Sequence, residues 1–121
     1  MAVYVDPLQW QYGRLQTCHL WADDVADLLG MADALVVPRR LLRGHPTLSV
    51  PYFQSETWVH FQIGAAARRQ AVHIGALETD TFGPEVHRLR PLLCSPHPNI
   101  QDAAARRLAD VAQTRFRLAQ S

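Results

Sequence analysis

The sequence of 121 residues contains no lysine, because all twelve of its basic residues are arginines. This absence excludes every mechanism that needs a lysine amine, either as a Schiff base or as a base with a lowered pKa. Cysteine is scarce as well: Cys18 and Cys94 are far apart and belong to no C-x-x-C pair. Two isolated cysteines form no disulfide framework, so we expect buried, unreactive thiols in a reducing cytoplasm.

Long apolar runs and signature motifs are also absent. No stretch approaches the length of a membrane span, and residues 1–6 lack the basic start of a signal peptide. The sequence has no phosphate-binding loop, no dinucleotide-binding glycine pattern, no nucleophile elbow and no H-E-x-x-H. We therefore expect no membrane partner, and a functional site that carries no standard motif.

The composition that remains indicates an ordinary globular domain. The length suits one domain, and 48% apolar with 19% charged residues excludes wholesale disorder. The net charge of +1 hides an uneven distribution: residues 1–37 hold five aspartates and one arginine, a net −4, whereas residues 38–121 hold eleven arginines and six acids, a net +5. This split permits neutralisation within one chain, neutralisation between two copies, or an anion-binding face.

Hydrophobic periodicity predicts a single α/β domain with a sheet of three to five strands and about three helices. An α/β core over residues 1–82 is followed by a Pro/His-rich connector, residues 83–98, and a long helix, residues 99–121, that packs on the core or on a second chain. The expected strands cover about residues 2–5, 17–21, 58–63 and 76–82, and the expected helices about residues 24–36, 65–74 and 99–119.

Two further segments are predicted to lie outside these helices and strands. Residues 8–15 are expected to form a loop that carries Trp10, Tyr12 and Arg14. Such aromatic faces beside a cation are typical of a platform on which a nucleic-acid base stacks, and equally of a protein interface. Residues 44–57 contain two prolines and are expected to form a loop, an edge hairpin or a mobile arm.

Four polar side chains fall on or near the ends of the predicted strands. Asp6 closes the first strand, and His60 lies on the strand over residues 58–63. His19 lies within the second strand and Asp23 just after it. In neighbouring strands of one sheet these side chains would converge, and imidazole with carboxylate can exchange protons near neutral pH or ligate a divalent metal. The structural alternative is a hydrogen-bonded strand histidine and a helix-capping aspartate.

Short motifs follow one another along the chain: Tyr4-Val5-Asp6, Gly13-Arg14, Cys18-His19-Leu20-x-Ala22-Asp23, His60-Phe61, Arg68-Arg69 and Gly75-Ala76. Their order and spacing resemble the small bacterial and phage family known only as domain of unknown function 4031, over about residues 2–80. The resemblance implies no established activity, and it places these residues at motif positions: Asp6, Arg14, His19, Asp23 and His60. Gln62 stands where the family usually carries an acidic residue, and residues 44–57 look like an insertion.

Two functional classes follow as expectations. The first is a module that binds or processes a phosphate-containing ligand, either nucleic acid or nucleotide, with His19, His60 and Asp6 as acid–base candidates. Its candidate ligand contacts are Arg14, Arg68, Arg69, Trp10 and Tyr12, and the candidate ligands for a divalent metal are Asp6, His19, Asp23 and His60. The alternative is a non-catalytic protein–protein interaction domain that forms a homodimer through its acidic and basic halves.

Overall fold

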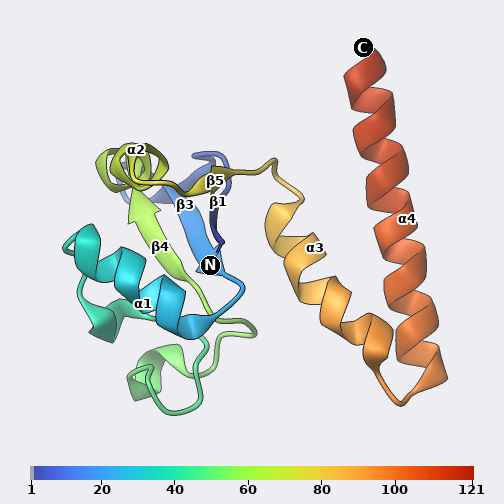
Figure 1. The fold of residues 1–121 in the computed structure, drawn as a ribbon, viewed down its shortest axis with the longest axis horizontal. Coiled ribbons are helices and arrows are strands. Elements are labelled where there is room, and N and C mark those ends of the chain that lie inside the picture. The colour runs from blue at the N-terminus through green and yellow to red at the C-terminus, as the bar shows by residue number, and fades with distance from the viewer. Residues whose placement is uncertain (1) are drawn as a thin grey trace. The chain divides into compact units, whose positions relative to one another are not determined.

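The computed structural model describes residues 2–121, which form two compact units that divide after Thr81. The first unit, residues 2–81, contains the strands and the first two helices, and the second unit, residues 82–121, contains two further helices (Figure 1). The structure confirms the expected small α/β class with a long C-terminal helix. Among the described residues, no helix is both long and apolar enough to span a membrane.

The first unit is built on a five-stranded sheet around one central strand. The strands are β1 (Val3–Val5), β2 (Trp10–Tyr12), β3 (Leu15–Ala22), β4 (Phe61–Gly64) and β5 (Leu77–Glu78). β1 pairs with the second half of β3 and β2 with its first half along one edge, while β4 pairs with the other edge, and all three pairs are antiparallel. β5 pairs with β1 in parallel, as strands joined through an intervening helix can.

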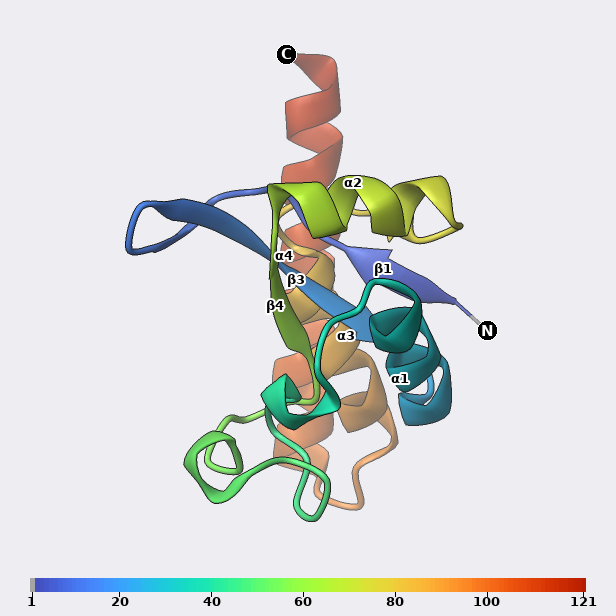
Figure 2. The same cartoon turned by 90° about the vertical axis from the view of Figure 1, so that its left-hand side faces the viewer.

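The hairpin of β2 and β3 occupies the segment expected as an irregular loop, residues 8–15, so that expectation was wrong. The strands pair from Trp10 opposite Thr17 to a turn at Gly13 and Arg14, and Figure 2 shows the hairpin extending beyond β1 and β4. Gly13 has a φ of 62°, a left-handed conformation that glycine adopts without strain. A three-residue strand shows little periodicity of its own, and it forms because β3 begins early enough to supply its partner.

Two helices, α1 (Val25–Ala34) and α2 (Ala65–His73), cover one face of the sheet, where the periodicity predicted helices (Figure 1). Asp24 caps α1, since its carboxylate accepts the N–H of Ala26 at 2.6 Å. The core lies between these helices and the sheet, and its deeply buried members include Val5, Leu20, Leu28, Leu42, Phe61 and Ala71. Alternate side chains of a strand face opposite ways, so the core uses only one face of the sheet.

Both helices end in the same hydrogen-bonded turn, the Schellman motif, which needs one residue with left-handed backbone. In α2 that residue is Gly75, with a φ of 120°, and its amide donates to the carbonyl of Val72. In α1 the equivalent residue is Val36, with a φ of 59°, and its amide donates to the carbonyl of Asp33. In both turns the amide of the following residue, Ala76 or Val37, donates to a carbonyl five residues earlier at 2.8 Å.

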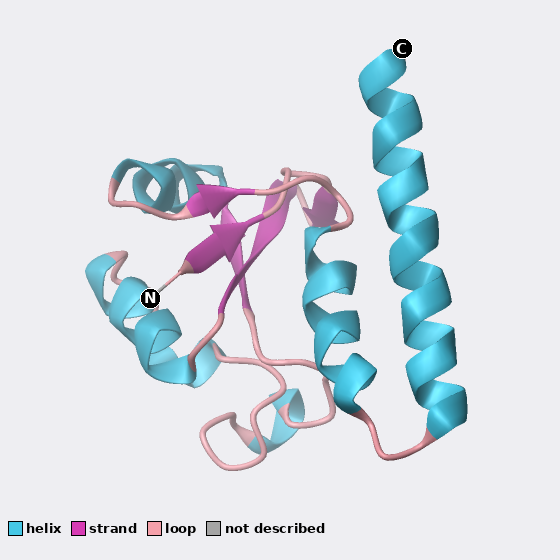
Figure 3. Cartoon of the chain, turned by 45° about the vertical axis from the view of Figure 1, so that its right-hand side comes forward, coloured by secondary structure: helices cyan, strands magenta, loops and turns pink. Residues whose placement is uncertain are grey.

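After α1 and a short 3₁₀ helix at Arg39–Leu41, residues 42–60 form a loop with one further 3₁₀ turn, Pro51–Phe53, that leads to β4 (Figure 3). The backbones of Arg43 and His60 join its ends, because each amide donates to the other's carbonyl, at 2.9 and 3.1 Å. Within the loop, the Arg43 guanidinium lies 4.5 Å from the centre of the Phe53 ring and binds the Glu56 carboxylate at 3.0 Å. Of the three forms expected for this segment, the structure has the loop.

The second unit pairs α3 (Gly83–Leu89) with α4 (Pro98–Gln120) through a 3₁₀ helix at Arg90–Cys94, and Figure 3 shows the two helices side by side. The segment expected as a connector, residues 83–98, thus contains a helix that begins with Pro84 in its first turn, a position that proline favours. Arg107 of α4 donates two hydrogen bonds to the Glu85 carboxylate of α3, at 2.7 and 2.8 Å.

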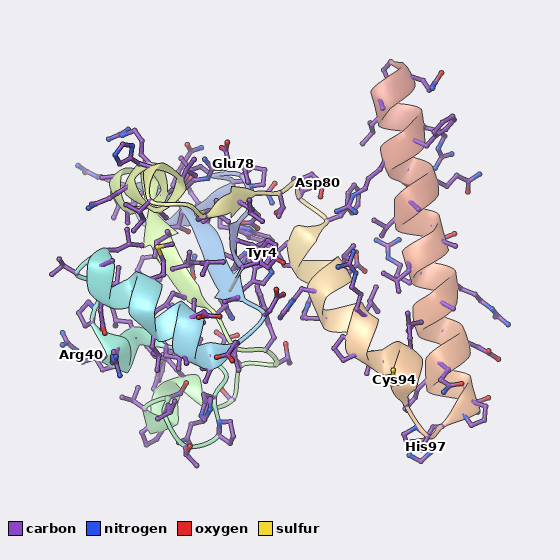
Figure 4. All side chains as sticks on the ribbon, viewed as in Figure 1. Tyr4, Arg40, Glu78, Asp80, Cys94 and His97 are labelled. Carbon is purple, nitrogen blue, oxygen red and sulfur yellow. The ribbon has the colours of Figure 1, made fainter. Side chains whose placement is uncertain are left out.

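The two cysteines lie in opposite environments. Cys18 on β3 is buried as expected, and this burial raises the pKa of its thiol to about 12. Cys94 is exposed at the end of the 3₁₀ helix, near the turn that leads into α4 (Figure 4). The expectation that it is buried was therefore wrong, because this short helix leaves the thiol at the surface.

Candidate functional site

The sheet face directed away from α1 and α2 carries aromatic and polar side chains. Strand alternation puts every second residue there, and the register brings together Tyr4 with Trp21, Trp10 with Thr17, and His19 with Gln62. His60 directly precedes β4 and shares this face, because it is two positions from Gln62. We call five residues the histidine cluster: Asp6, Trp10, His19, Trp58 and His60.

Asp6 binds His19 through both of its carboxylate oxygens. Neither β1 nor β2 pairs with β3 at His19, because this position faces the chain between the two strands. There, Asp6 Oδ1 accepts the backbone N–H of His19 at 2.6 Å, in place of a backbone carbonyl. Its Oδ2 lies 2.8 Å from His19 Nδ1. Asp6 is fully buried, and a buried carboxylate is stable only with such partners. The pair orients the imidazole with its proton on Nδ1 and leaves Nε2 for other contacts.

His60 is held by the backbone of Trp58. Its Nδ1 lies 3.0 Å from the Trp58 carbonyl oxygen, which can only accept, so Nδ1 carries the proton. The His60 ring stacks on the Trp58 indole with 4.0 Å between ring centres and 13° between ring planes. Burial lowers the pKa of His60 to about 4, although the hydrogen bond to the Trp58 carbonyl opposes this effect. At neutral pH His60 is therefore uncharged, with a lone pair on Nε2.

The two imidazoles lie next to each other, with ring centres 5.2 Å apart and planes at 73°. The indoles of Trp10 and Trp58 stand beside the His19 ring, with centre-to-centre distances of 5.2 and 5.3 Å. Among residues 2–121 neither Nε2 makes a hydrogen bond; the His19 side chain is 16% exposed and His60 only 3%. The cluster thus presents two ring nitrogens whose orientations are fixed by the hydrogen bonds at Nδ1.

Gly44 allows the loop over residues 42–60 to approach this cluster closely. Its φ of 81° is left-handed, and a Cβ built on it would collide with the Trp58 carbonyl, the group that holds His60. Only glycine therefore fits at this position. The segment that looked like an insertion in the sequence positions two members of the cluster.

A groove of about 250 Å³ lies on the same sheet face as the cluster. Its lining residues are Tyr12, Leu15, Thr17, Leu41, Arg43, Phe53, Gln62 and Gly64. Its polar floor is a hydrogen-bonded chain in which Gln62 Nε2 donates to Thr17 Oγ1 at 2.7 Å, and Oγ1 donates to the Trp10 carbonyl at 3.0 Å. Because Gln62 pairs with His19 across β3 and β4, the groove and the cluster are adjacent.

Three of the four residues expected to converge lie together: Asp6, His19 and His60. Asp23 lies beyond the other end of β3, where its carboxylate accepts a hydrogen bond from the Tyr4 hydroxyl at 3.1 Å. Within residues 2–121, no group of three or more His, Cys, Asp or Glu side chains is arranged to hold a metal ion. In the structure both oxygens of Asp6 are engaged by His19.

The three arginines expected at a phosphate site lie in different places. Arg68 on α2 donates to the Asp6 carbonyl at 2.9 Å and binds the carboxylate of Glu78, labelled in Figure 4, at 3.0 Å. It therefore positions the end of β1 that carries Asp6. Arg69 is exposed on α2. Arg14 is exposed in the turn between β2 and β3, next to the strand ends that line the groove.

Sequence reasoning missed the contributions of Trp58, Gln62 and Arg43. Trp58 and Gln62 alternate with His60, and this alternation put all three on one face, which was the signal for their role. Arg43 reaches the site only through its backbone pairing with His60, a contact between residues far apart in the chain that leaves no local pattern.

A family model described as Protein of unknown function (DUF4031) matches residues 3–90. This match confirms the resemblance expected over about residues 2–80 and extends it into α3. No curated protein and no solved structure matches the chain.

Proposed function

The chain belongs to the family Protein of unknown function (DUF4031), and from the geometry of its own residues we propose that it binds a nucleoside phosphate at the histidine cluster. The ligand is either a free nucleotide or a stretch of single-stranded nucleic acid, which share this chemistry. One observation carries the proposal: His19 and His60 lie side by side, each with Nδ1 held by a fixed acceptor and with no hydrogen bond at Nε2 among residues 2–121.

The two imidazoles suit the two kinds of group that a nucleoside phosphate offers. His60 is neutral at pH 7, so its Nε2 accepts a hydrogen bond from a sugar hydroxyl. In its protonated form, His19 donates from Nε2 to a phosphate oxygen while Asp6 holds its other nitrogen. The pair can therefore contact both the sugar and the phosphate of the ligand.

The surroundings of the pair supply stacking and charge. Trp10 and Tyr12 are 47% and 66% exposed, so flat ring surface remains for a base to stack on. Arg14 follows Tyr12 at the turn and has no ion-pair partner among residues 2–121, which leaves its guanidinium for a phosphate. Arg14 lies in the turn that precedes β3, and His19 is the fifth residue of that strand. A stretch of single-stranded nucleic acid along this strand would contact the arginine near one end and the histidines near the other.

The test is a titration of the protein, followed by amide chemical shifts, in two arms. One arm uses a mixture of the four ribonucleoside 5′-monophosphates, and the other a mixed-sequence single-stranded RNA ten-mer. The variants His19→Asn and His60→Asn each keep an amide nitrogen near the position of Nδ1 but lack Nε2. His73→Asn, at the exposed end of α2, is the matched control.

We expect the wild type and His73→Asn to bind. His19→Asn should lose at least about ten-fold in affinity, as for a hydrogen bond to a charged group, and His60→Asn about two- to ten-fold, as for a hydrogen bond to a neutral group. Binding in only one arm identifies the source of the ligand. The proposal is overturned if the wild type binds in neither arm, or if folded cluster variants bind as tightly as the control.

A further inference from the structure

Gln62, on the floor of the groove, has a carboxamide whose orientation the hydrogen-bond network determines. The Thr17 hydroxyl has one proton and donates it to the Trp10 carbonyl, so it can only accept from Gln62. The group of Gln62 that faces Thr17 is therefore its NH₂. Its Oε1 and second N–H make no hydrogen bond with residues 2–121, so they form a neighbouring acceptor and donor in the groove.

The rest of the groove suits a flat ring. Tyr12, Leu15 and Phe53 supply apolar wall, and the cation of Arg43 is already bound by Glu56. The volume of about 250 Å³ lies just below the roughly 300–1,000 Å³ of sites for drug-sized ligands, so it suits one base rather than a larger ligand. Because Gln62 pairs with His19, a base bound there places its sugar and phosphate next to the histidine cluster.

We propose that this groove is the base-binding pocket of the ligand and that Gln62 makes it selective for adenine. This inference rests on the proposed function, because it names the base of the same ligand. On one edge adenine carries an amino donor beside the ring acceptor N7, the pattern that a glutamine amide pairs with in two hydrogen bonds, whereas the same edge of guanine carries two acceptors. The fixed Oε1 of Gln62 therefore favours adenine over guanine, because it accepts from the amino group of adenine but faces an acceptor oxygen in guanine.

The test compares the binding of adenosine 5′-monophosphate with that of guanosine 5′-monophosphate by titration calorimetry. Gln62→Met keeps the length of the side chain and removes both polar groups. Gln16→Met is the matched control, because Gln16 lies on β3, the strand that pairs with β4, and is exposed on the opposite face. Tyr12→Ala, at an exposed position, removes stacking without removing the amide.

We expect wild type and Gln16→Met to bind the adenine nucleotide about five- to 150-fold more tightly than the guanine nucleotide, the range for a bidentate pair. Gln62→Met should bind both nucleotides equally, and Tyr12→Ala should weaken both alike. If Gln62→Met does not fold, the Tyr12→Ala variant tests the groove. The groove is supported if wild type prefers adenine and Tyr12→Ala keeps this preference while it binds both nucleotides more weakly. If wild type binds both nucleotides equally, or Gln62→Met keeps the preference, the inference fails and the proposed function stands. If wild type binds neither nucleotide nor the RNA ten-mer, both fail.

Discussion

At the scale of single residues, the buried imidazole of His60 makes stability depend on pH. Its pKa in the folded state is about 4, below the 6.5 of an exposed histidine. Between these values the unfolded state binds more protons than the folded state, so the free energy of unfolding rises with pH through this window and is lost as the pH falls. From pH 7 to pH 4.5 we expect this residue to account for a loss of about 2–3 kcal/mol.

Urea unfolding at pH 7, 5.5 and 4.5 measures this effect. The variant His60→Asn keeps an N–H for the Trp58 carbonyl and does not titrate, so its stability should fall less over the same range. Comparing the change with pH, rather than the absolute stability, removes the cost of the smaller side chain. Parallel profiles for the two proteins would contradict the assigned pKa.

The two thiols should react at very different rates in the folded protein. Cys94 is exposed, whereas Cys18 is buried with a pKa raised to about 12, and only the thiolate is nucleophilic. A chromogenic disulfide reagent at pH 8 should modify one thiol per chain before denaturation and two in guanidinium chloride. Cys94→Ser should show no rapid reaction in the folded state, and a rapid reaction of that variant would place Cys18 at the surface.

At the scale of secondary-structure elements, the two Schellman turns have different residues at the left-handed position, valine in α1 and glycine in α2. Their backbone strain should therefore differ. A non-glycine residue in the left-handed region costs roughly 1–2 kcal/mol, and Val36 is 87% exposed, so little packing offsets this cost. Val36→Gly should raise the free energy of unfolding by about 1 kcal/mol, since part of the gain is lost to the freer unfolded chain. Gly75→Val, at the same position of the other helix, should lower it. Thermal unfolding of both variants tests the pair, and equal shifts in one direction would disagree with this account.

The loop over residues 42–60 depends on Gly44 in a different way. Its neighbour there is the Trp58 backbone rather than a flexible side chain, so Gly44→Ala must displace the carbonyl that holds His60. We expect a loss of at least about 2 kcal/mol in stability, from left-handed strain together with the displaced loop, and weaker nucleotide binding. Gly30→Ala, at an exposed position in α1 with nothing near its Cβ, should instead stabilise by about 1 kcal/mol. Unfolding curves of both variants, with a nucleotide titration of each, separate the two effects.

The elements that could be predicted are those whose pattern is local. The three longer helices repeat apolar residues at helical spacing, and each is found near its expected bounds. β2 and α3 were missed because a three-residue strand and a seven-residue helix carry too little periodicity, and distant partners stabilise both. The candidate site likewise has one part that a local pattern predicts and one part that it does not. His19 and His60 follow from strand position, whereas the groove depends on the closure of a loop that no local pattern encodes.

At the scale of the whole molecule, the charge split along the sequence does not coincide with the division of the structure. The first unit contains six arginines and eight acids, a net −2, and the second contains six arginines and three acids, a net +3. Some acids of the first third are bound locally, as Asp6 is to His19 and Asp33 to Arg39. The charge that can act over longer distances is therefore the net charge of each unit. These net charges, −2 and +3, differ by less than the −4 and +5 of the two parts of the sequence.

Opposite net charges still allow two chains to associate head to tail, so the homodimer remains a prediction. Light scattering at low salt should give about twice the 13.6 kDa of one chain, and in 1 M salt, where the screening length falls to about 3 Å, it should approach a single chain. Arg106→Glu at an exposed site on α4 lowers the charge of the second unit from +3 to +1 and should weaken the dimer at low salt, whereas Arg106→Lys should not. A single-chain mass at both salt concentrations would contradict the interaction alternative, because charge attraction between copies would then be too weak to hold them together.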